Sequence, residues 1–249
     1  MSATASSRLA VVVLAAGRGK RFPGVPSKVL VELDGKPLVG HVLDAVAELR
    51  PWRTVVVVGH GKDEVRRRLG RRSLETVDQG EPHGTGHAVQ VAGSALGRAS
   101  CVVLVLNGDV PGVRAVTMRR LVETLEDGTA AAILTAEVEE PGAYGRIVRR
   151  ADGRVEAIVE AADATAEILR LREINVGSYA FRAPDVFDVL AQVTDDNAQG
   201  EIYLTDVVAR LVARGEAVAA VVLDDPAEGS GVNTPEDLDR LRSGGPAGG

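Results

Sequence analysis

The chain has 249 residues, of which 45% are hydrophobic and 26% charged, and this composition predicts a globular α/β protein with a large buried core. Its formal net charge of -6 argues against nucleic acid or an anionic membrane surface as the main partner, because either would require a broad basic face. The single cysteine, Cys101, excludes an internal disulfide and a zinc site made of several thiolates.

Residues 1–7 are small and polar and lack the cationic and apolar pattern of a secretory signal. No segment approaches the roughly 18 consecutive apolar residues of a membrane span. We therefore expect a cytoplasmic protein whose first seven residues form a flexible tail.

Short apolar runs rich in β-branched residues alternate with amphipathic segments along the first 140 residues. This alternation is typical of a parallel sheet covered by helices. The expected strands are 9–14, 54–58, 74–77, 102–106 and 130–138, and helical patterns such as 37–50 and 115–128 lie between them.

The pattern changes at Tyr144, where polar and apolar residues alternate around Asp152 and Gly153, a dipeptide favoured in tight hairpin turns. A second, antiparallel lobe is predicted there, followed by a strand over 173–181 and helices over 185–193 and 201–214. We expect one domain over 8–242, made of two parts (8–140 and 141–242), and a flexible tail over 243–249.

The stretch 14–28, LAAGRGKRFPGVPSK, is a glycine-rich loop after the first expected strand. It contains no acid and four basic residues, Arg18, Lys20, Arg21 and Lys28. A dinucleotide fingerprint fails at Phe22, and a Walker loop fails at Arg21. Glycines still let backbone N–H groups approach an anion, and basic side chains add charge there. The loop favours a polyphosphate site over a solvated basic turn.

Two further segments follow expected strands. In QGEPHGTGHAV (79–89), Gly84, Thr85 and Gly86 fall at a predicted helix N-terminus, which suits either ligand recognition by backbone or a simple cap formed by Thr85. In NGDVP (107–111), Asp109 lies where ligands collect beside parallel sheets. Asp109 is therefore a candidate Mg²⁺ ligand, with a turn or helix cap as the alternative.

These motifs, together with AYGRIVR, IVEAADA, EINVG, NAQGEIYLTD and GVN, resemble in sequence and order the uridyltransferase domain of bacterial bifunctional UDP-N-acetylglucosamine pyrophosphorylase/glucosamine-1-phosphate acetyltransferases. The resemblance extends from about Leu9 to Leu241. It implies a Rossmann-like, mixed but mainly parallel sheet flanked by helices, of the nucleotide-diphospho-sugar transferase type, with a small antiparallel sugar-binding lobe. By this resemblance, 8–140 would be the nucleotide-binding part and 141–242 the sugar-binding part. It also implies Mg²⁺-dependent joining of UTP and N-acetylglucosamine 1-phosphate into UDP-N-acetylglucosamine and pyrophosphate.

The same resemblance implies roles for individual residues. The nucleotide would bind at Leu14, Ala15, Ala16, Gly17, Gln79, Gly84 and Thr85, with Thr85 also near the sugar. The sugar would bind at Asn107, Gly145, Glu160 and Asn175. Arg21 and Lys28 fall on the catalytic positions, and Asp109 and Asn233 on the Mg²⁺ ligands. Simpler roles also exist: Gly145 can serve a turn, Glu160 can be a solvated strand residue, and Asn197 and Glu201 can cap a helix.

Several positions depart from the family pattern, namely Lys20, Asn107, Gly112 and Ala162. Asn107 and Ala162 fall on the sugar side, so they concern the choice of sugar more than nucleotidyl transfer. The sequence also lacks the hexapeptide repeats of the acetyltransferase β-helix, so acetyl transfer is expected to be absent. Two alternatives stay open: a pyrophosphorylase for another sugar 1-phosphate or pyrimidine nucleotide, and a catalytically weak sugar-nucleotide-binding regulator.

Overall fold

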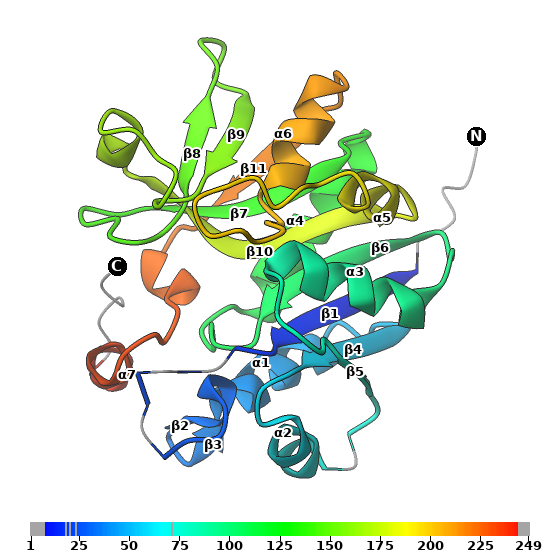
Figure 1. Ribbon diagram of the computed structural model, residues 1–249, viewed down its shortest axis with the longest axis vertical. Helices are drawn as coiled ribbons and strands as arrows, with labels where there is room; N and C mark the ends of the chain where they lie inside the picture. The colour runs from blue at the N-terminus through cyan, green and yellow to red at the C-terminus, as the bar shows by residue number, and fades with distance from the viewer. Residues whose placement is uncertain (1–7, 18, 20, 23, 71, 244–249) are drawn as a thin grey trace.

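A mixed sheet with helices on both faces forms the centre of the computed structural model (Figure 1), which describes residues 8–243 except Arg18, Lys20, Pro23 and Arg71. The side chains of Glu126 and Asp127 also lie outside the description. The expected tails, apart from Ser243, therefore lie outside the described residues, as do the basic side chains of Arg18 and Lys20.

The sheet contains β1 (Leu9–Ala15), β4 (Arg53–Val58), β5 (Glu75–Asp78), β6 (Cys101–Asn107), β7 (Ala131–Glu137), β8 (Arg146–Arg149), β9 (Val155–Val159), β10 (Glu173–Ala183) and β11 (Val218–Val222). Two short strands, β2 (Glu32–Leu33) and β3 (Lys36–Pro37), form a separate hairpin. The helices are α1 (Leu38–Ala47), α2 (Lys62–Leu69), α3 (Thr85–Leu96), α4 (Ala115–Glu123), α5 (Asp185–Leu190), α6 (Asp206–Ala213) and α7 (Pro235–Arg242). Short 3₁₀ turns cover Lys28–Leu30, Thr124–Asp127, Ile168–Arg170 and Pro226–Gly229.

The main strand order is β11-β7-β10-β6-β1-β4-β5. β6, β1, β4 and β5 are parallel neighbours, and β11 is parallel to β7. Only β10 runs against its neighbours β6 and β7 within this order. The expected mixed, mainly parallel sheet is confirmed.

The core consists of two layers because side chains alternate across each strand. Val11 and Val13 of β1 face the layer that also contains α1, α2 and α4, whereas Val12 faces the layer with α3, α5 and α6. All three valines are fully buried. A strand covered on both faces is the structural reason for the uninterrupted apolar run that the sequence shows at β1.

The second lobe adds the antiparallel hairpin β8–β9 beside β10. Its turn follows the prediction, because Gly153 has φ +83 and its N–H donates to the carbonyl of Arg150. The predicted helix over 201–214 starts only at Asp206 in the structure. The residues before it form no regular structure and are held by a distant loop, since the N–H of Ile202 donates to the carbonyl of His83.

The parallel strands β1 and β6 end at the same edge of the sheet, where Leu14 pairs with Asn107. The N–H of Gly108 donates to the carbonyl of Leu14, which joins the two loops that leave this edge. The loops after β1 and β6, which carry candidate site residues, therefore start close together at this edge. This is where ligands bind in open parallel sheets. Within the described part of the chain, no helix is long and apolar enough to cross a membrane.

Candidate active site

Two adjoining cavities lie at the carboxyl ends of β1 and β6. The first, of about 350 Å³, is lined by Leu14, Ala16, Gly17, Lys28, Val29, Gln79, Pro82, Gly84, Thr85, Ala88, Asn107, Asp109 and Glu201. The second, of about 220 Å³, includes Asn107, Asp109, Gly145, Glu160, Asn175, Thr205 and Asn233 in its lining. Leu14, Thr85, Asn107 and Asp109 line both, so the predicted nucleotide and sugar residues surround two spaces that share one wall.

Lys28 stands at the end of the glycine-rich loop, on a 3₁₀ turn. Gly19 has φ +61, and a Cβ at this position would lie 2.8 Å from Cβ of Lys28. Only glycine allows the loop to pass this close to the lysine with such a backbone angle. Ser27 is buried and its hydroxyl donates to the carbonyl of Gly17 at 3.3 Å, which closes the loop from the other side.

Lys28 contacts the two predicted metal ligands at once. Its Nζ forms an ion pair with the carboxylate of Asp109 and donates a hydrogen bond of 2.8 Å to Oδ1 of Asn233. The side chains of Lys28 and Asp109 are 19% and 17% exposed, so the pair is largely shielded from water. Three residues that are distant in the sequence therefore meet at the shared wall of the two cavities.

The donor set at this point suits a magnesium ion. Mg²⁺ prefers hard oxygen ligands and usually takes one or two protein groups beside water and phosphate oxygens. Asp109 offers a carboxylate and Asn233 an amide oxygen, and both already lie against the same cationic nitrogen. Among the described residues no group of three His, Cys, Asp or Glu side chains could hold a metal, so an all-protein cage is not the kind of site present.

Arg21 lies apart from the first cavity. It lines a neighbouring cavity of about 430 Å³ together with Tyr144, Asn233 and Arg240. Asn233 lines both this space and the second cavity, so it separates Arg21 from that cavity's other lining residues.

The predicted base-binding segment is fixed by backbone contacts from a distant part of the chain. Gln79 is buried, and its Nε2 donates to the carbonyl of Gly84 at 3.0 Å. The N–H of Gly86 donates to the carbonyl of Ile202, and the hydroxyl oxygen of Thr85 accepts from the N–H of Leu204. Thr85 therefore does not cap α3 but joins the segment 201–204.

The second cavity contains a shielded carboxyl group. Glu160 accepts a hydrogen bond from the hydroxyl of Thr205 at 3.1 Å, and burial raises the pKa of the Glu160 carboxyl. Gly145 lies beside it, since a Cβ there would be 3.4 Å from Oε2 of Glu160. Glu160 is thus held in the cavity wall rather than solvated on an open strand.

Asn175 and Asn107 lie beside an irregularity of β10. Asn175 donates to the hydroxyl of Tyr179 at 2.6 Å and accepts from the N–H of Gly177 at 3.0 Å. The register of β10 against β7 shifts between Asn175 and Tyr179. Gly177 has φ +83, and a Cβ on it would lie 2.3 Å from Nδ2 of Asn107. The asparagine at position 107 therefore occupies the space that the glycine leaves open.

Most predicted site residues line one of the cavities. Ala15 and Asn197 do not, and the structure places each of them elsewhere. Ala15 is 1% exposed within the core, so its predicted role rests on its backbone. Asn197 does not start a helix; its side chain organises a turn by accepting from the N–H of Gln199 and of Glu201. The sequence interpretation missed Thr205, Tyr144 and Gly177, although a glycine inside an apolar strand pattern is a signal for a bulge or a close approach.

A mainly parallel sheet with two adjoining cavities at the carboxyl ends of its strands is the arrangement expected of a nucleotidyltransferase-type α/β domain. Comparison with known proteins agrees: residues 11–211 match the family described as "MobA-like NTP transferase domain". The chain belongs to this family.

Curated relatives place the chain more closely. It is 43% identical over 229 residues to "Bifunctional protein GlmU" of Shouchella clausii (strain KSM-K16), covering 92% of this chain and 50% of that protein. It is 46% identical over 247 residues to the protein of the same name from Thermobifida fusca (strain YX), covering 96% and 51%. The chain thus spans about half the length of the curated relatives it matches.

A solved structure shares the fold at low sequence identity. It is described as UDP-glucose pyrophosphorylase complexed with UDP-glucose, and it superposes with a TM-score of 0.77 at 18% identity. The match covers 95% of this chain and 99% of that one, so the whole described fold, including the second lobe, has this architecture.

Proposed function

We propose that this protein joins UTP to N-acetylglucosamine 1-phosphate, giving UDP-N-acetylglucosamine and pyrophosphate. The single observation that carries the proposal is the meeting of Lys28, Asp109 and Asn233 at the wall between two cavities. A reaction between two phosphate compounds needs cationic help at the point where they meet. The sequence provides a basic loop for this point in a chain of net charge -6.

The reaction requires charge neutralisation and alignment rather than a general base. The phosphate oxygen of the sugar 1-phosphate is already anionic near neutral pH, and it attacks the α-phosphorus while pyrophosphate leaves on the opposite side. Bringing two polyanions together is the main obstacle, and holding them in line supplies much of the rate. In the proposed reaction, Lys28 stabilises the charge that develops at the α-phosphorus.

The remaining chemistry follows from the positions of the other side chains. Asp109 and Asn233 would hold Mg²⁺, which when bound polarises phosphoryl oxygens and offsets their charge. Arg21, which lines a neighbouring cavity with Asn233, would hold the departing phosphates. Gln79 and the backbone at Gly84 would recognise the base, as Ala16 and Gly17 line the same cavity.

The proposed sugar rests on the second cavity and on the relatives. Gly145, Glu160 and Asn175 line that cavity together, and the hydroxyl of Thr205 orients Glu160. The family resemblance in the motifs that carry these residues supports N-acetylglucosamine 1-phosphate. Asn107, packed against Gly177, shapes one wall of this cavity. If the protein prefers another sugar, we expect Asn107 to be responsible for that preference.

The test is pyrophosphate release by the purified protein with Mg²⁺, over a grid of nucleoside triphosphates and sugar 1-phosphates. Release restricted to UTP with N-acetylglucosamine 1-phosphate would support the proposal. Release with a different pair would keep the mechanism and change the substrate. Nucleotide binding without release across the grid would instead support a sugar-nucleotide-binding regulator.

A further inference from the structure

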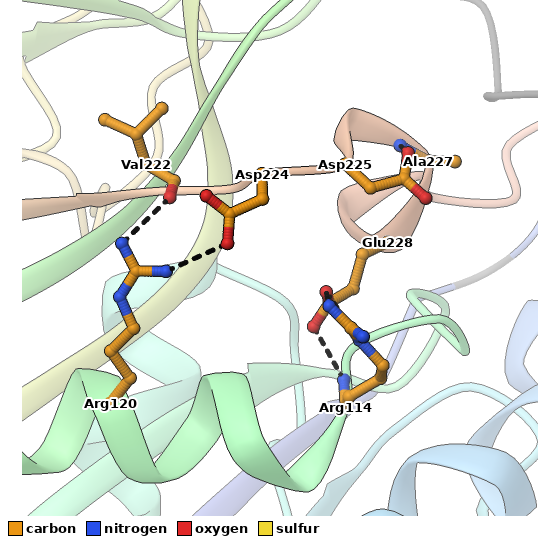
Figure 2. Close-up of polar contacts among 7 residues, drawn as sticks. All are labelled: Arg114, Arg120, Val222, Asp224, Asp225, Ala227 and Glu228. Atoms are coloured by element: carbon orange, nitrogen blue, oxygen red, sulfur yellow. Dashed lines mark hydrogen bonds and ion pairs between the residues drawn. The ribbon is translucent and has the colours of Figure 1, made fainter.

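One buried carboxylate lies outside both cavities and faces the loop that carries Asp109. Glu228 belongs to the 3₁₀ turn Pro226–Gly229, and its side chain is 4% exposed. One carboxylate oxygen accepts the backbone N–H of Arg114 at 2.9 Å, and the other accepts Nε of the same residue at 2.8 Å (Figure 2). The guanidinium also forms an ion pair of 2.6 Å with this carboxylate.

The two segments joined by this contact are those that carry the proposed metal ligands. Asp109 begins the loop that ends at Arg114, the residue before α4. Asn233 lies shortly after the turn that contains Glu228. The two segments also touch through backbone, because the N–H of Val232 donates to the carbonyl of Asp109 at 2.9 Å.

The two segments also approach closely at Gly112. A Cβ on Gly112 would lie 2.8 Å from the carbonyl oxygen of Glu228, so no side chain fits between the segments there. This close approach accounts for glycine at position 112. The relative position of Asp109 and Asn233 is thus fixed at one end by the Val232 hydrogen bond and at the other by the Glu228 carboxylate.

The two partners of this contact differ in how much they depend on each other, because only the Glu228 carboxylate is buried. A buried carboxylate needs hydrogen-bond donors and a cation, and removing them leaves a costly unpaired charge. The Glu228 side chain is almost entirely shielded, whereas that of Arg114 is 62% exposed and can be hydrated by water. Removing the arginine side chain would therefore leave a buried carboxylate without its cation, whereas Glu228→Gln removes the buried charge and leaves a guanidinium that water can hydrate.

We propose that Glu228 is a positioning residue for the metal site: by holding the N–H and guanidinium of Arg114, it sets the distance between Asp109 and Asn233. The inference rests on the proposed function, in which these two residues hold Mg²⁺. Mg²⁺ demands near-ideal octahedral geometry and short ligand distances, so it tolerates little displacement between its ligands. A small separation of the loops weakens metal binding while both ligands remain present.

The structure contains a matched control for this contact. Arg120 of α4 pairs with Asp224 at 3.4 Å and also donates to the carbonyl of Val222, so it joins the same helix to the same stretch of chain (Figure 2). Both side chains are exposed, at 52% and 86%. Among the described residues, neither side chain has a hydrogen bond or ion pair with residues 109–114, although the charge of Asp224 also acts on Arg114 through space. Asp224→Asn therefore removes an exposed ion pair of α4 and leaves the hydrogen bonds between Glu228 and Arg114 in place.

The experiment compares wild type, Glu228→Gln and Asp224→Asn by titration with Mn²⁺ in the presence of UTP, followed by electron paramagnetic resonance of free Mn²⁺. Glutamine keeps the size and one acceptor for the Arg114 N–H, but its amide cannot pair with the guanidinium. We expect Glu228→Gln to weaken Mn²⁺ binding about tenfold, the lower end of what outer-shell partners contribute. Asp224→Asn should stay within about twofold of wild type because exposed ion pairs contribute little.

Steady-state kinetics separate positioning from general destabilisation. Glu228→Gln should raise the Mg²⁺ concentration for half-maximal turnover and leave the KM for the sugar 1-phosphate unchanged. A folded variant, judged by near-ultraviolet circular dichroism, whose Mn²⁺ affinity equals that of wild type would overturn the inference. If Glu228→Gln does not fold, the Mn²⁺ affinity of Arg114→Ala tests the inference in its place, because the Arg114 side chain is exposed. Arg114→Lys should then restore Mn²⁺ binding.

The outcomes also distinguish this inference from the proposed function. A wild-type protein that binds Mn²⁺ with UTP but transfers no nucleotide, and whose Glu228→Gln variant binds Mn²⁺ more weakly, supports the positioning role and refutes the activity. If wild type has the proposed activity and Glu228→Gln binds Mn²⁺ as tightly as wild type, the result supports the activity and refutes the positioning role. Absence of Mn²⁺ binding by wild type overturns the positioning role itself.

Discussion

Nζ of Lys28 donates a hydrogen bond of 2.8 Å to Oδ1 of Asn233, a residue 205 positions further along the chain. The same nitrogen pairs with Asp109, which follows the central strand β6. One cationic atom thus connects the start, the middle and the end of the described chain at a single point. This point is where the proposed reaction would need positive charge.

Lys28→Ala should reduce turnover by about 10²- to 10³-fold, the range measured when one preorganised electrostatic contact to a transition state is removed. The lysine side chain is partly exposed, so the fold should persist. Pyrophosphate release measures the effect. Lys36→Ala is the control, because Lys36 pairs with Asp44 at 2.6 Å in an exposed ion pair outside both cavities. A near-normal rate for Lys28→Ala would remove the lysine from the mechanism.

Gln79→Ala should weaken UTP binding by about 1–3 kcal/mol and reduce the preference for uracil, since a hydrogen-bonding group of a buried pocket is lost. Binding of UTP, CTP and ATP measured by calorimetry tests both effects. Gln192→Ala provides a control, because Gln192 is exposed and, among the described residues, its side chain bonds only the carbonyl of Asp188 in α5 and Arg214. The same nucleotide profile in Gln79→Ala and wild type would show that Gln79 does not recognise the base.

Gly84→Ala should destabilise the nucleotide loop more than Gly80→Ala. Both glycines have positive φ, +100 and +69, so alanine is strained at either site. The strain is larger at Gly84, whose ψ of 177 places it in a backbone region essentially restricted to glycine, at a cost of about 1–3 kcal/mol. Only at Gly84 would the added Cβ also lie 2.6 Å from the carbonyl oxygen of Ile202. Urea unfolding and UTP affinity measure the difference. Equal effects of the two substitutions would show that neither the backbone angle nor the contact with Ile202 makes alanine more destabilising at Gly84.

Glu160→Gln should have opposite effects on stability and on sugar binding. Burial raises the native pKa of Glu160 above its ordinary value of 4.5, so the native state holds its proton more readily than the unfolded chain. The stability associated with this proton is present at low pH and is lost as the pH rises from 4.5 through the raised native pKa. Glutamine does not titrate and should avoid that loss, whereas the KM for the sugar 1-phosphate should rise.

Urea midpoints of wild type and Glu160→Gln, measured across this pH range, test the stability effect. The midpoint of the variant should increase relative to wild type as the pH rises. Glu156→Gln, on the exposed side of the same strand β9, should show no such trend. A constant difference between Glu160→Gln and wild type at all pH values would contradict the assigned shift.

The sequence predicted the sheet well because local patterns determine buried strands. The runs of valine at β1 and β4 have the composition and length of strands covered on both sides, and no competing pattern overlaps them. α2 was not predicted, since its sequence KDEVRRRL buries only Val65 and Leu69 and shows little apolar periodicity. The start of α6 was misplaced because residues 201–204 bond to the distant loop at 83–86, a contact that no local pattern reveals.

The candidate site was predictable in its residue types but not in its pairings. The residues Lys28, Asp109 and Asn233 were found through motifs, yet their common contact depends on how three loops pack. The space that Gly177 leaves for Asn107 was missed for the same reason, because glycine carries no side chain to signal its partner. The junction between Glu228 and Arg114 likewise joins residues 114 positions apart that carry no recognisable motif.

The position of β10 has a consequence for dissecting this chain. β10 belongs to the predicted sugar-binding part (141–242), yet it lies between β6 and β7, which both belong to the predicted nucleotide-binding part (8–140) (Figure 1). A polypeptide ending near residue 140 would expose the backbone of two strands at once, and such open edges promote aggregation. The two parts should consequently unfold in one cooperative transition, and co-expressed halves should become soluble only through mutual complementation.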